Sequence, residues 1–326
     1  AIGTGGFRGE CAHYSLKAME MQIEYAACYR RMFGHDLSPY PDATLAIPRM
    51  MFCHYFPESP QAKPVKLYIN GWSDLWGHML AYGYPLAPDN MKGAYLWAWN
   101  RQMGVLGPED LTKLAAGKGF GAEGEAVWFF LSYPLETKPQ HPSESMPLTW
   151  QAPDHGFYGF RNSWKGRGDF VLLIHARTHA PGGWNGPNTG TFRLFGLDQS
   201  WNDTYSGREI CAWEENRVML PEDPAFDAGL GRVTHVAAEP DGSGAVSIDM
   251  SDVYNPASGR AYSMYGNVRE PNVFKDAKIR ALRAFGVDYS GKSGAPCLFV
   301  LVDRIVGGKS RLWTWNLGDA AVVPKV

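Results

Sequence analysis

The most conspicuous group of chemically reactive side chains lies in one short stretch, residues 175–188. Its sequence, His-Ala-Arg-Thr-His-Ala-Pro-Gly-Gly-Trp-Asn-Gly-Pro-Asn, follows one apolar run and precedes another. Histidine transfers protons near neutral pH, asparagine donates hydrogen bonds, and an arginine guanidinium offers a two-pronged donor for a carboxylate. We therefore expect a loop between two strands that carries Arg177, His179 and Asn185 as reactive groups; ordinary polar residues at strand ends are the alternative.

A second group lies near the N-terminus, where Arg8, His13 and Tyr14 stand close together. Apolar residues recur at spacings of three and four over residues 16–32, and Gly34 suits a helix C-terminus, so the pattern predicts a long amphipathic helix. The positive end of its dipole, together with Arg8, would favour the phenolate of Tyr14, although a tyrosine that merely anchors the helix start is the alternative. His13 points to another side, because neighbours on a helix are about 100° apart.

The aromatic content and the charge balance narrow the class of ligand. The chain of 326 residues contains 12 Trp, 16 Tyr and 16 Phe, and its formal net charge is −2. Without a basic stripe it lacks the electrostatic signature of a nucleic-acid-binding protein, whereas aromatic faces commonly stack against sugar rings. A carbohydrate is therefore the favoured ligand, and Trp72 and His78 are candidate contacts, with core packing as the alternative for the nearby Trp76.

The elements that must position these groups change type along the chain. Residues 1–135 predict helices, residues 136–155 a proline-rich linker, and residues 156–326 an antiparallel β-sandwich, which together make an α+β multidomain chain. Strands do not alternate with helices, and no glycine-rich phosphate-binding motif occurs, so a doubly wound nucleotide-binding fold is excluded. The expected helices beyond the first cover residues 41–56, 73–83, 89–103, 109–117 and 123–133; the expected strands cover residues 170–174, 191–195, 232–236, 245–249, 297–302 and 312–315.

Two further patterns exclude other classes of protein. No apolar run approaches the roughly 18 residues that a membrane-spanning helix needs, so no membrane partner is expected. The five cysteines are scattered without a Cys-x-x-Cys pair, which argues against a zinc ribbon and a disulfide scaffold. We expect the cysteines to be unpaired.

Several strings in the chain resemble segments of the heparinase II/III-like polysaccharide lyases. The first is Gly-Gly-Phe-Arg-Gly-Glu-Cys-Ala-His-Tyr at residues 5–14, followed by the long predicted helix. The others match the β-sandwich of that family piece by piece and in order: residues 169–174, 188–192 and 249–254, then Arg283, residues 298–304 and the Trp-Asn pair at 315–316. The resemblance covers most of the chain, but none of the strings specifies the polysaccharide.

The resemblance implies an incomplete (α/α) toroid of helix pairs in front of the sandwich. Residues 1–135 have room for only about three pairs. We therefore expect the chain to be the C-terminal part of a longer lyase, whose N-terminal helical segment is missing here, with a naturally short toroid or a homo-oligomer as alternatives. The expected protein is secreted or periplasmic.

Lyases of this kind cleave a polysaccharide that contains uronic acid by β-elimination, and the resemblance extends this activity and an acidic polysaccharide substrate to the chain. It assigns the acid–base role to Tyr14 and neutralisation of the carboxylate to His179, Asn185 and Arg177. The family usually carries His-x-His-x-Asp-x-Gly-Ser-Phe before the second strand, whereas this chain has Gly186 where the nearer histidine would stand. The expected substrate-binding residues are Arg8, His13, Trp72, His78, His175, Trp184 and Asn188.

No cofactor is required for this chemistry, although some family members hold a structural zinc in the sandwich. Asp203 and His235 fall roughly where two zinc ligands would lie, but zinc normally takes three or four. Two other functions remain open at the level of sequence. A uronate C5-epimerase of the same fold would remove the same proton and return it to the other face, and a noncatalytic polysaccharide-binding protein would keep the cleft without the reaction.

Overall fold

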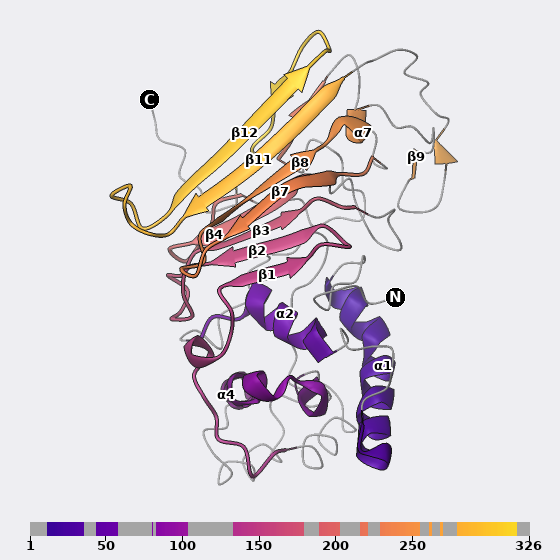
Figure 1. The fold of residues 1–326 in the computed structure, drawn as a ribbon, viewed down its shortest axis with the longest axis vertical. Coiled ribbons are helices and arrows are strands. Elements are labelled where there is room, and N and C mark those ends of the chain that lie inside the picture. Colours follow the sequence, from indigo (N-terminus) through magenta and orange to yellow (C-terminus); the bar gives the residue numbers. More distant parts are fainter. Residues whose placement is uncertain are drawn as a thin grey trace.

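The protein is a mixed α+β structure in which helices come first and antiparallel sheets follow (Figure 1). The computed structural model describes residues 12–35, 44–57, 80, 83–103, 133–178, 189–202, 216–220, 229–254, 261–262, 268–269 and 279–317. The helices are α1 (Ala12–Phe33), α2 (Ala46–His54), α4 (Lys92–Met103) and the short α7 (Ser251–Tyr254), with single 3₁₀ turns η3 (Tyr84–Leu86), η4 (Asp89–Met91) and η6 (Pro142–Glu144).

The long first helix ends as its sequence predicts. Arg30 and Arg31 lie in the last turn of α1, where positive side chains complement the helix dipole. Gly34 follows with a φ of 73°, and its backbone N–H donates to the carbonyl of Arg30 at 2.8 Å. Such a left-handed residue after a helix is most easily a glycine, because it has no Cβ.

The first sheet is a five-stranded antiparallel meander that is buried on both faces. It consists of β1 (Thr149–Ala152), β2 (Phe157–Arg161), β3 (Val171–His175), β4 (Thr191–Gly196) and β5 (Gln199–Ser200), in that order. Every residue of β2, β3 and β4 is buried. One face packs against α2, where Phe52 approaches the backbone so closely that only the glycine at position 159 leaves room for its ring.

The second sheet covers the other face of the first. It contains β7 (Arg232–Ala238), β8 (Gly244–Asp249), β11 (Arg280–Asp288) and β12 (Leu298–Val306), in the order β12-β11-β8-β7, and all the pairings are antiparallel. Side chains of both sheets share one hydrophobic core; Phe192 of β4 lies 5.4 Å from Phe285 of β11 and 5.3 Å from Phe299 of β12, between ring centres. Helices, first sheet and second sheet therefore form successive layers (Figure 1).

Two further short pairs complete the described strands: β6 (Val218–Met219) with β13 (Leu312–Trp313), and β9 (Ala261–Tyr262) with β10 (Val268–Arg269). No helix in the described part of the chain is both long enough and apolar enough to cross a membrane. Cys28, Cys53 and Cys297 are free, as expected, while Cys11 and Cys211 lie outside the described residues.

Most expected elements in the described ranges are confirmed, with shifted bounds. The helix expected over 41–56 begins at Ala46 after a short 3₁₀ turn, and the helix over 89–103 begins as the 3₁₀ turn η4. The first sheet starts earlier than expected, because β1 lies inside the stretch assigned to the linker. Prolines do not prevent this, since β1 is an edge strand and begins after Pro147. The helices expected over 109–117 and 123–133, and most of 73–83, lie outside the described residues.

Candidate functional site

The reactive loop expected at residues 175–188 leaves the first sheet at the end of β3 and returns at the start of β4. Its two stems are fixed to each other, because Gly190 donates its backbone N–H to the carbonyl of His175 at 2.9 Å. The outgoing stem is fixed again by Ala176, which donates to Gly156 at 2.7 Å, and by Arg177, which accepts from Gly231 at 3.1 Å. The described part of the loop is therefore anchored to the turn before β2 and to the segment before β7.

Arg177 adopts a backbone conformation that is unusual for its residue type. Its φ is 49°, in the left-handed region that costs a residue with a side chain roughly 1–2 kcal/mol. Its side chain is buried, with 4% of the residue exposed. Strained residues of this kind persist where the surrounding structure fixes them, and they gather at functional sites. Arg177 thus places a permanent positive charge at the base of the loop.

His175 lies beside this charge and stays neutral. Burial lowers the pKa of its imidazole to about 3, and the neighbouring positive charges of Arg177, His155 and Arg49 act in the same direction. A hydrogen bond with the backbone of His155 opposes these effects only in part. Because Arg49 belongs to α2, the helical layer also reaches this corner of the molecule. An imidazole with this pKa is a poor proton acceptor at neutral pH, so His175 does not serve as a general base.

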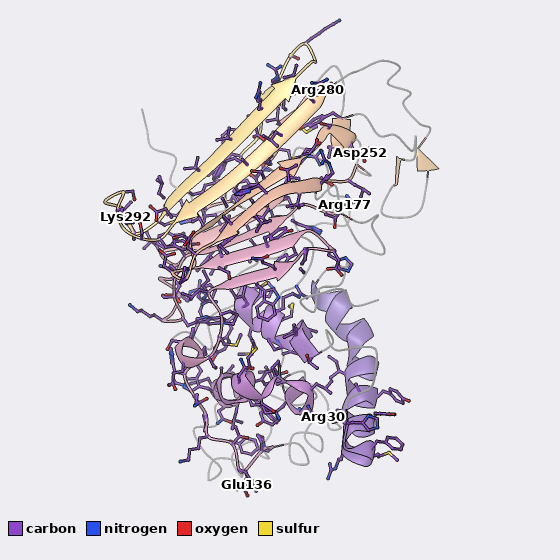
Figure 2. The ribbon with its side chains drawn as sticks, viewed as in Figure 1. Arg30, Glu136, Arg177, Asp252, Arg280 and Lys292 are labelled. Atoms are coloured by element: carbon purple, nitrogen blue, oxygen red, sulfur yellow. The ribbon has the colours of Figure 1, made fainter. Side chains whose placement is uncertain are left out.

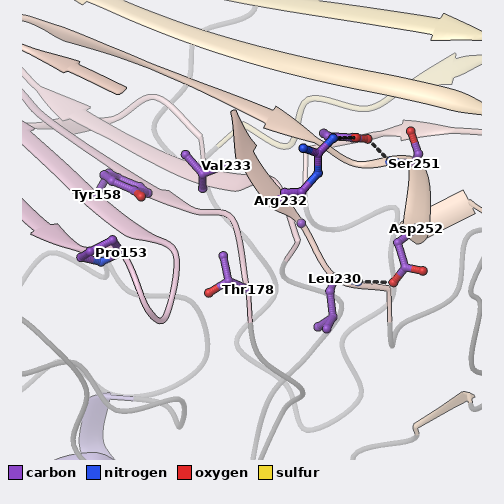
Figure 3. Close-up of a pocket in the computed structure, with 10 residues that line it drawn as sticks. Pro153, Tyr158, Thr178, Leu230, Arg232, Val233, Ser251 and Asp252 are labelled. Carbon is purple, nitrogen blue, oxygen red and sulfur yellow. Dashed lines mark hydrogen bonds and ion pairs between the residues drawn. The ribbon is translucent and has the colours of Figure 1, made fainter. Parts of the chain in front are cut away.

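An open cavity of about 940 Å³ lies next to the loop stem (Figure 3). Pro153, Tyr158 and Thr178 come from the first sheet and its loops, whereas Leu230, Gly231, Arg232, Val233, Asp249, Ser251 and Asp252 come from the edge of the second sheet and α7. Thr178 directly follows Arg177, and its hydroxyl donates to the carbonyl of Asp154 at 2.6 Å. Figure 2 shows Arg177 and Asp252 at the same end of the two sheets, with Lys292 at the opposite end.

The polar wall of the cavity is organised around Asp249. Its Oδ2 accepts from Arg232 Nη2 at 2.7 Å and its Oδ1 accepts from the backbone N–H of Ser251 at 3.0 Å. Hydrogen bonding by Ser251, with a further contribution from Arg232, lowers the pKa of Asp249 and keeps it a carboxylate. Asp252 Oδ2 accepts from the backbone N–H of Leu230 at 2.8 Å, which fixes a second carboxylate nearby.

Tyr158 closes the cavity on the side of the first sheet. The residue is buried, and desolvation raises the pKa of its hydroxyl. The hydroxyl therefore keeps its proton at neutral pH and can donate a hydrogen bond, but it is not a ready base.

The structure brings together three of the residues that the sequence singled out, or their immediate neighbours: His175, Arg177 and Thr178. Tyr14 and His13 lie in the first turn of α1, but their side chains are outside the described part of the structure. Figure 1 shows that this end of α1 is directed toward the sheets, with the other end away from them. The remaining predicted site residues lie outside the described residues: Arg8, Trp72, His78, His179, Trp184, Asn185, Asn188 and Asp203.

The zinc site stays a prediction. His235 is exposed on β7, the edge strand of the second sheet. No group of three or more metal-ligating side chains occurs within the described residues, and the other expected ligand, Asp203, is not among them.

Sequence reasoning missed the polar residues of the cavity wall. Asp249, Ser251 and Asp252 belong to a string that carried the family resemblance, yet none was assigned a role in binding. Their signal was an Asp-x-Ser-Asp sequence directly after an apolar strand, a pattern in which side chains cap a turn at a strand end. Arg232, the first residue of the next expected strand, had no pattern that distinguished it from an ordinary exposed arginine.

Comparison with known proteins adds no assignment to this geometry. A scan against protein-family models finds no match, and a search of curated proteins also finds none.

Proposed function

We propose that the protein is a polysaccharide lyase that cleaves a uronic-acid-containing polymer by β-elimination. The observation that carries the proposal is the placement of Arg177, the arginine expected to neutralise a carboxylate. It is held in a strained backbone conformation at the base of the predicted loop, beside a neutral histidine and next to a cavity of about 940 Å³. Known ligand pockets have volumes of roughly 300–1,000 Å³.

The proposed reaction removes the proton on the carbon next to the uronate carboxyl group. The electrons of that C–H bond form a double bond to the neighbouring carbon, the bond from this neighbour to the glycosidic oxygen breaks, and the oxygen takes up a proton. The developing negative charge spreads into the carboxyl group and needs positive charge or hydrogen-bond donors in fixed positions. Arg177 would supply this charge from the base of the loop, where the low dielectric of its buried position strengthens the electrostatic interaction.

Tyr14 is the proposed acid–base group, as the family resemblance implies. The first turn of α1 lies at the end of the helix directed toward the sheets, which supports a position across from the loop (Figure 1). His175 does not compete for this role, because its pKa of about 3 makes it a weak base. Arg177 and His175 are both buried, so we assign them to fixing the charge and shape of the loop stem, while His179 and Asn185 are the proposed direct contacts.

At the level of the fold, we propose that the helices belong to an incomplete (α/α) toroid and that the two large sheets form a β-sandwich. The hydrophobic core that both sheets share supports the second assignment. The contact of α2 with the first sheet supports a site at the junction of the two parts.

The direct test is an assay on separate polymers of uronic acid, including alginate, glucuronan, heparan and unsulfated chondroitin. Elimination creates a double bond conjugated to a carboxylate, which absorbs in the ultraviolet. We expect at least one polymer to give this absorbance with the wild-type protein, and Arg177→Ala to lower kcat/KM on it by about 10²-fold or more, as for the loss of other fixed electrostatic groups. The absence of unsaturated product from every polymer would overturn the proposal.

A further inference from the structure

The cavity beside the loop stem has a charge balance that does not suit an acidic sugar. Among the described residues that line it, the charged ones are Arg232, Asp249 and Asp252, two carboxylates against one guanidinium. Arg232 and Asp249 neutralise each other at 2.7 Å, which leaves the second carboxylate in excess. A uronate in this cavity would bring a further negative charge toward that excess.

The same wall offers good partners for an uncharged sugar. Carboxylate oxygens accept hydrogen bonds from hydroxyl groups, and the guanidinium of Arg232, whose side chain is 76% exposed, donates to them. Tyr158 keeps its hydroxyl proton and adds a donor from the opposite wall. Pro153, Leu230 and Val233 provide apolar surface for the C–H groups of a sugar ring. Figure 3 shows these apolar residues on both sides of the polar group.

The cavity is connected to the site proposed for the reaction. Thr178, which lines it, directly follows Arg177, and Gly231, which also lines it, donates its backbone N–H to the carbonyl of Arg177 at 3.1 Å. A polymer that places one residue over the loop therefore has a neighbouring residue within reach of the cavity.

We propose that this cavity binds an uncharged pyranose residue adjacent to the reacting uronate, so that the substrate is a polymer in which uronate alternates with a neutral sugar. The inference rests on the proposed lyase function and names the substrate class of that site. It requires no additional group or cofactor, because binding in the cavity involves hydrogen bonds and apolar contacts alone.

The first measurement compares two polymers that share the same reacting sugar. Glucuronan contains only glucuronate, whereas unsulfated chondroitin alternates glucuronate with N-acetylgalactosamine. We expect kcat/KM on chondroitin to exceed that on glucuronan by about tenfold, the scale of one unfavourable charge contact in a partly solvated site. An equal or higher value on glucuronan would overturn the inference and leave the lyase function intact.

Charge variants make the test directional. Asp252→Asn and Asp249→Asn each remove one negative charge, so both should raise the ratio of glucuronan to chondroitin kcat/KM, by severalfold. Arg232→Gln leaves both carboxylates without their cation and should lower the ratio. Asp288→Asn is the matched control: Asp288 accepts from the backbone N–H of Ser290 at 2.8 Å, as Asp249 does from Ser251, but it lies at the end of β11 and does not line the cavity.

A purely structural role for these residues would lower both activities together and leave the ratio unchanged, which would contradict the inference. Calorimetric titration with chondroitin and glucuronan tetrasaccharides separates it from the proposed function, because binding does not depend on turnover. If no polymer yields unsaturated product, the lyase proposal fails, and the titration still decides the present one. Tighter binding of the chondroitin tetrasaccharide supports the neutral-sugar site; equal binding, tighter binding of the glucuronan tetrasaccharide, or binding of neither overturns it.

Discussion

His175 illustrates at the scale of one residue how burial sets chemistry. It occupies the last position of β3, where protonation would place a second positive charge beside Arg177 inside the protein. The sequence predicted a histidine at the site but not its protonation state, because that depends on Arg49 and His155, which are distant along the chain. Residue types were therefore predictable here, whereas their pKa values were not.

The depressed pKa predicts how stability depends on pH. The folded-state pKa of His175 is about 3, below the ordinary value of 6.5, so below pH 6.5 the unfolded chain takes up a proton that the folded protein does not. The free energy of unfolding should therefore fall as the pH falls from 6.5 toward 3, by up to about 1.4 kcal/mol per pH unit from this residue. Urea unfolding of wild type and His175→Gln at several pH values measures the effect.

We expect His175→Gln to have the flatter pH dependence, because glutamine does not titrate. His235→Gln, at an exposed position on β7, is the control and should retain the wild-type slope. Identical slopes for His175→Gln and the wild type would show that the buried imidazole is not the source.

The strained backbone of Arg177 can be separated from its charge by two substitutions. Glycine tolerates a φ of 49° and alanine does not, so Arg177→Gly should be more stable than Arg177→Ala by about 1 kcal/mol in urea unfolding. Both lack the guanidinium, so both should lose a similar factor in kcat/KM. Recovery of activity in the glycine variant alone would mean that the charge of Arg177 does not matter.

At the scale of elements, Arg161 of β2 joins the helical layer to the first sheet. Its buried guanidinium donates to the carbonyl of Phe52 in α2 at 3.1 Å, to the carbonyl of Ser163 at 2.6 Å and to the carboxylate of Asp169 at 3.3 Å. It also lies 3.8 Å from the ring centre of Trp164. Even though burial lowers its pKa to about 10, it stays charged at neutral pH.

We expect Arg161→Met to destabilise the protein by about 3–5 kcal/mol, because it leaves Asp169 as a buried carboxylate without its cation. Arg167→Met is the control: its ion pair with Asp198 is on the surface, and losing it should cost about 1 kcal/mol or less. Urea unfolding of both variants gives the comparison. A loss of similar size in the two would mean that Arg161 does not join the layers.

Strands were predictable where their pattern matched their environment. The apolar runs of β3 and β4 predicted strands because these strands are buried on both faces. β11 was missed although it has nine residues, because Arg283 occupies a core-facing position and Leu282 the exposed face. Arg283 is accommodated by paired hydrogen bonds to Asp303 on β12 at 2.7 and 2.8 Å, a contact that spans 20 residues and has no local signal.

At the scale of the whole molecule, the layers determine which thiols can react. Cys28 is exposed on α1, whereas Cys53 is buried between α2 and the first sheet, where desolvation raises its pKa to about 12. Alkylation of the native protein should therefore modify Cys28 and spare Cys53 until the protein is unfolded, as mapped by mass spectrometry of peptides. Native modification of Cys53 would contradict the packing of the helical layer.

The site itself was predictable in part, because residues close in sequence, such as His175 and Arg177, remain together at the end of β3. The cavity wall was not, because Thr178 and Asp252 meet only when the two sheets are placed face to face. The family resemblance named an acid–base tyrosine, whereas the charges that would distinguish one polysaccharide from another come from the second sheet.

The most direct test of the account is the reaction of the uronate polymers in deuterium oxide, followed by both ultraviolet absorbance and mass analysis of the sugars. The account predicts unsaturated product with the wild-type protein, and a loss of about 10²- to 10⁴-fold in kcat for Tyr14→Phe, with tetrasaccharide binding nearly unchanged. Deuterium exchanged into the uronate without unsaturated product would instead establish an epimerase, and binding without either change would establish a noncatalytic protein. Either result would contradict the central claim.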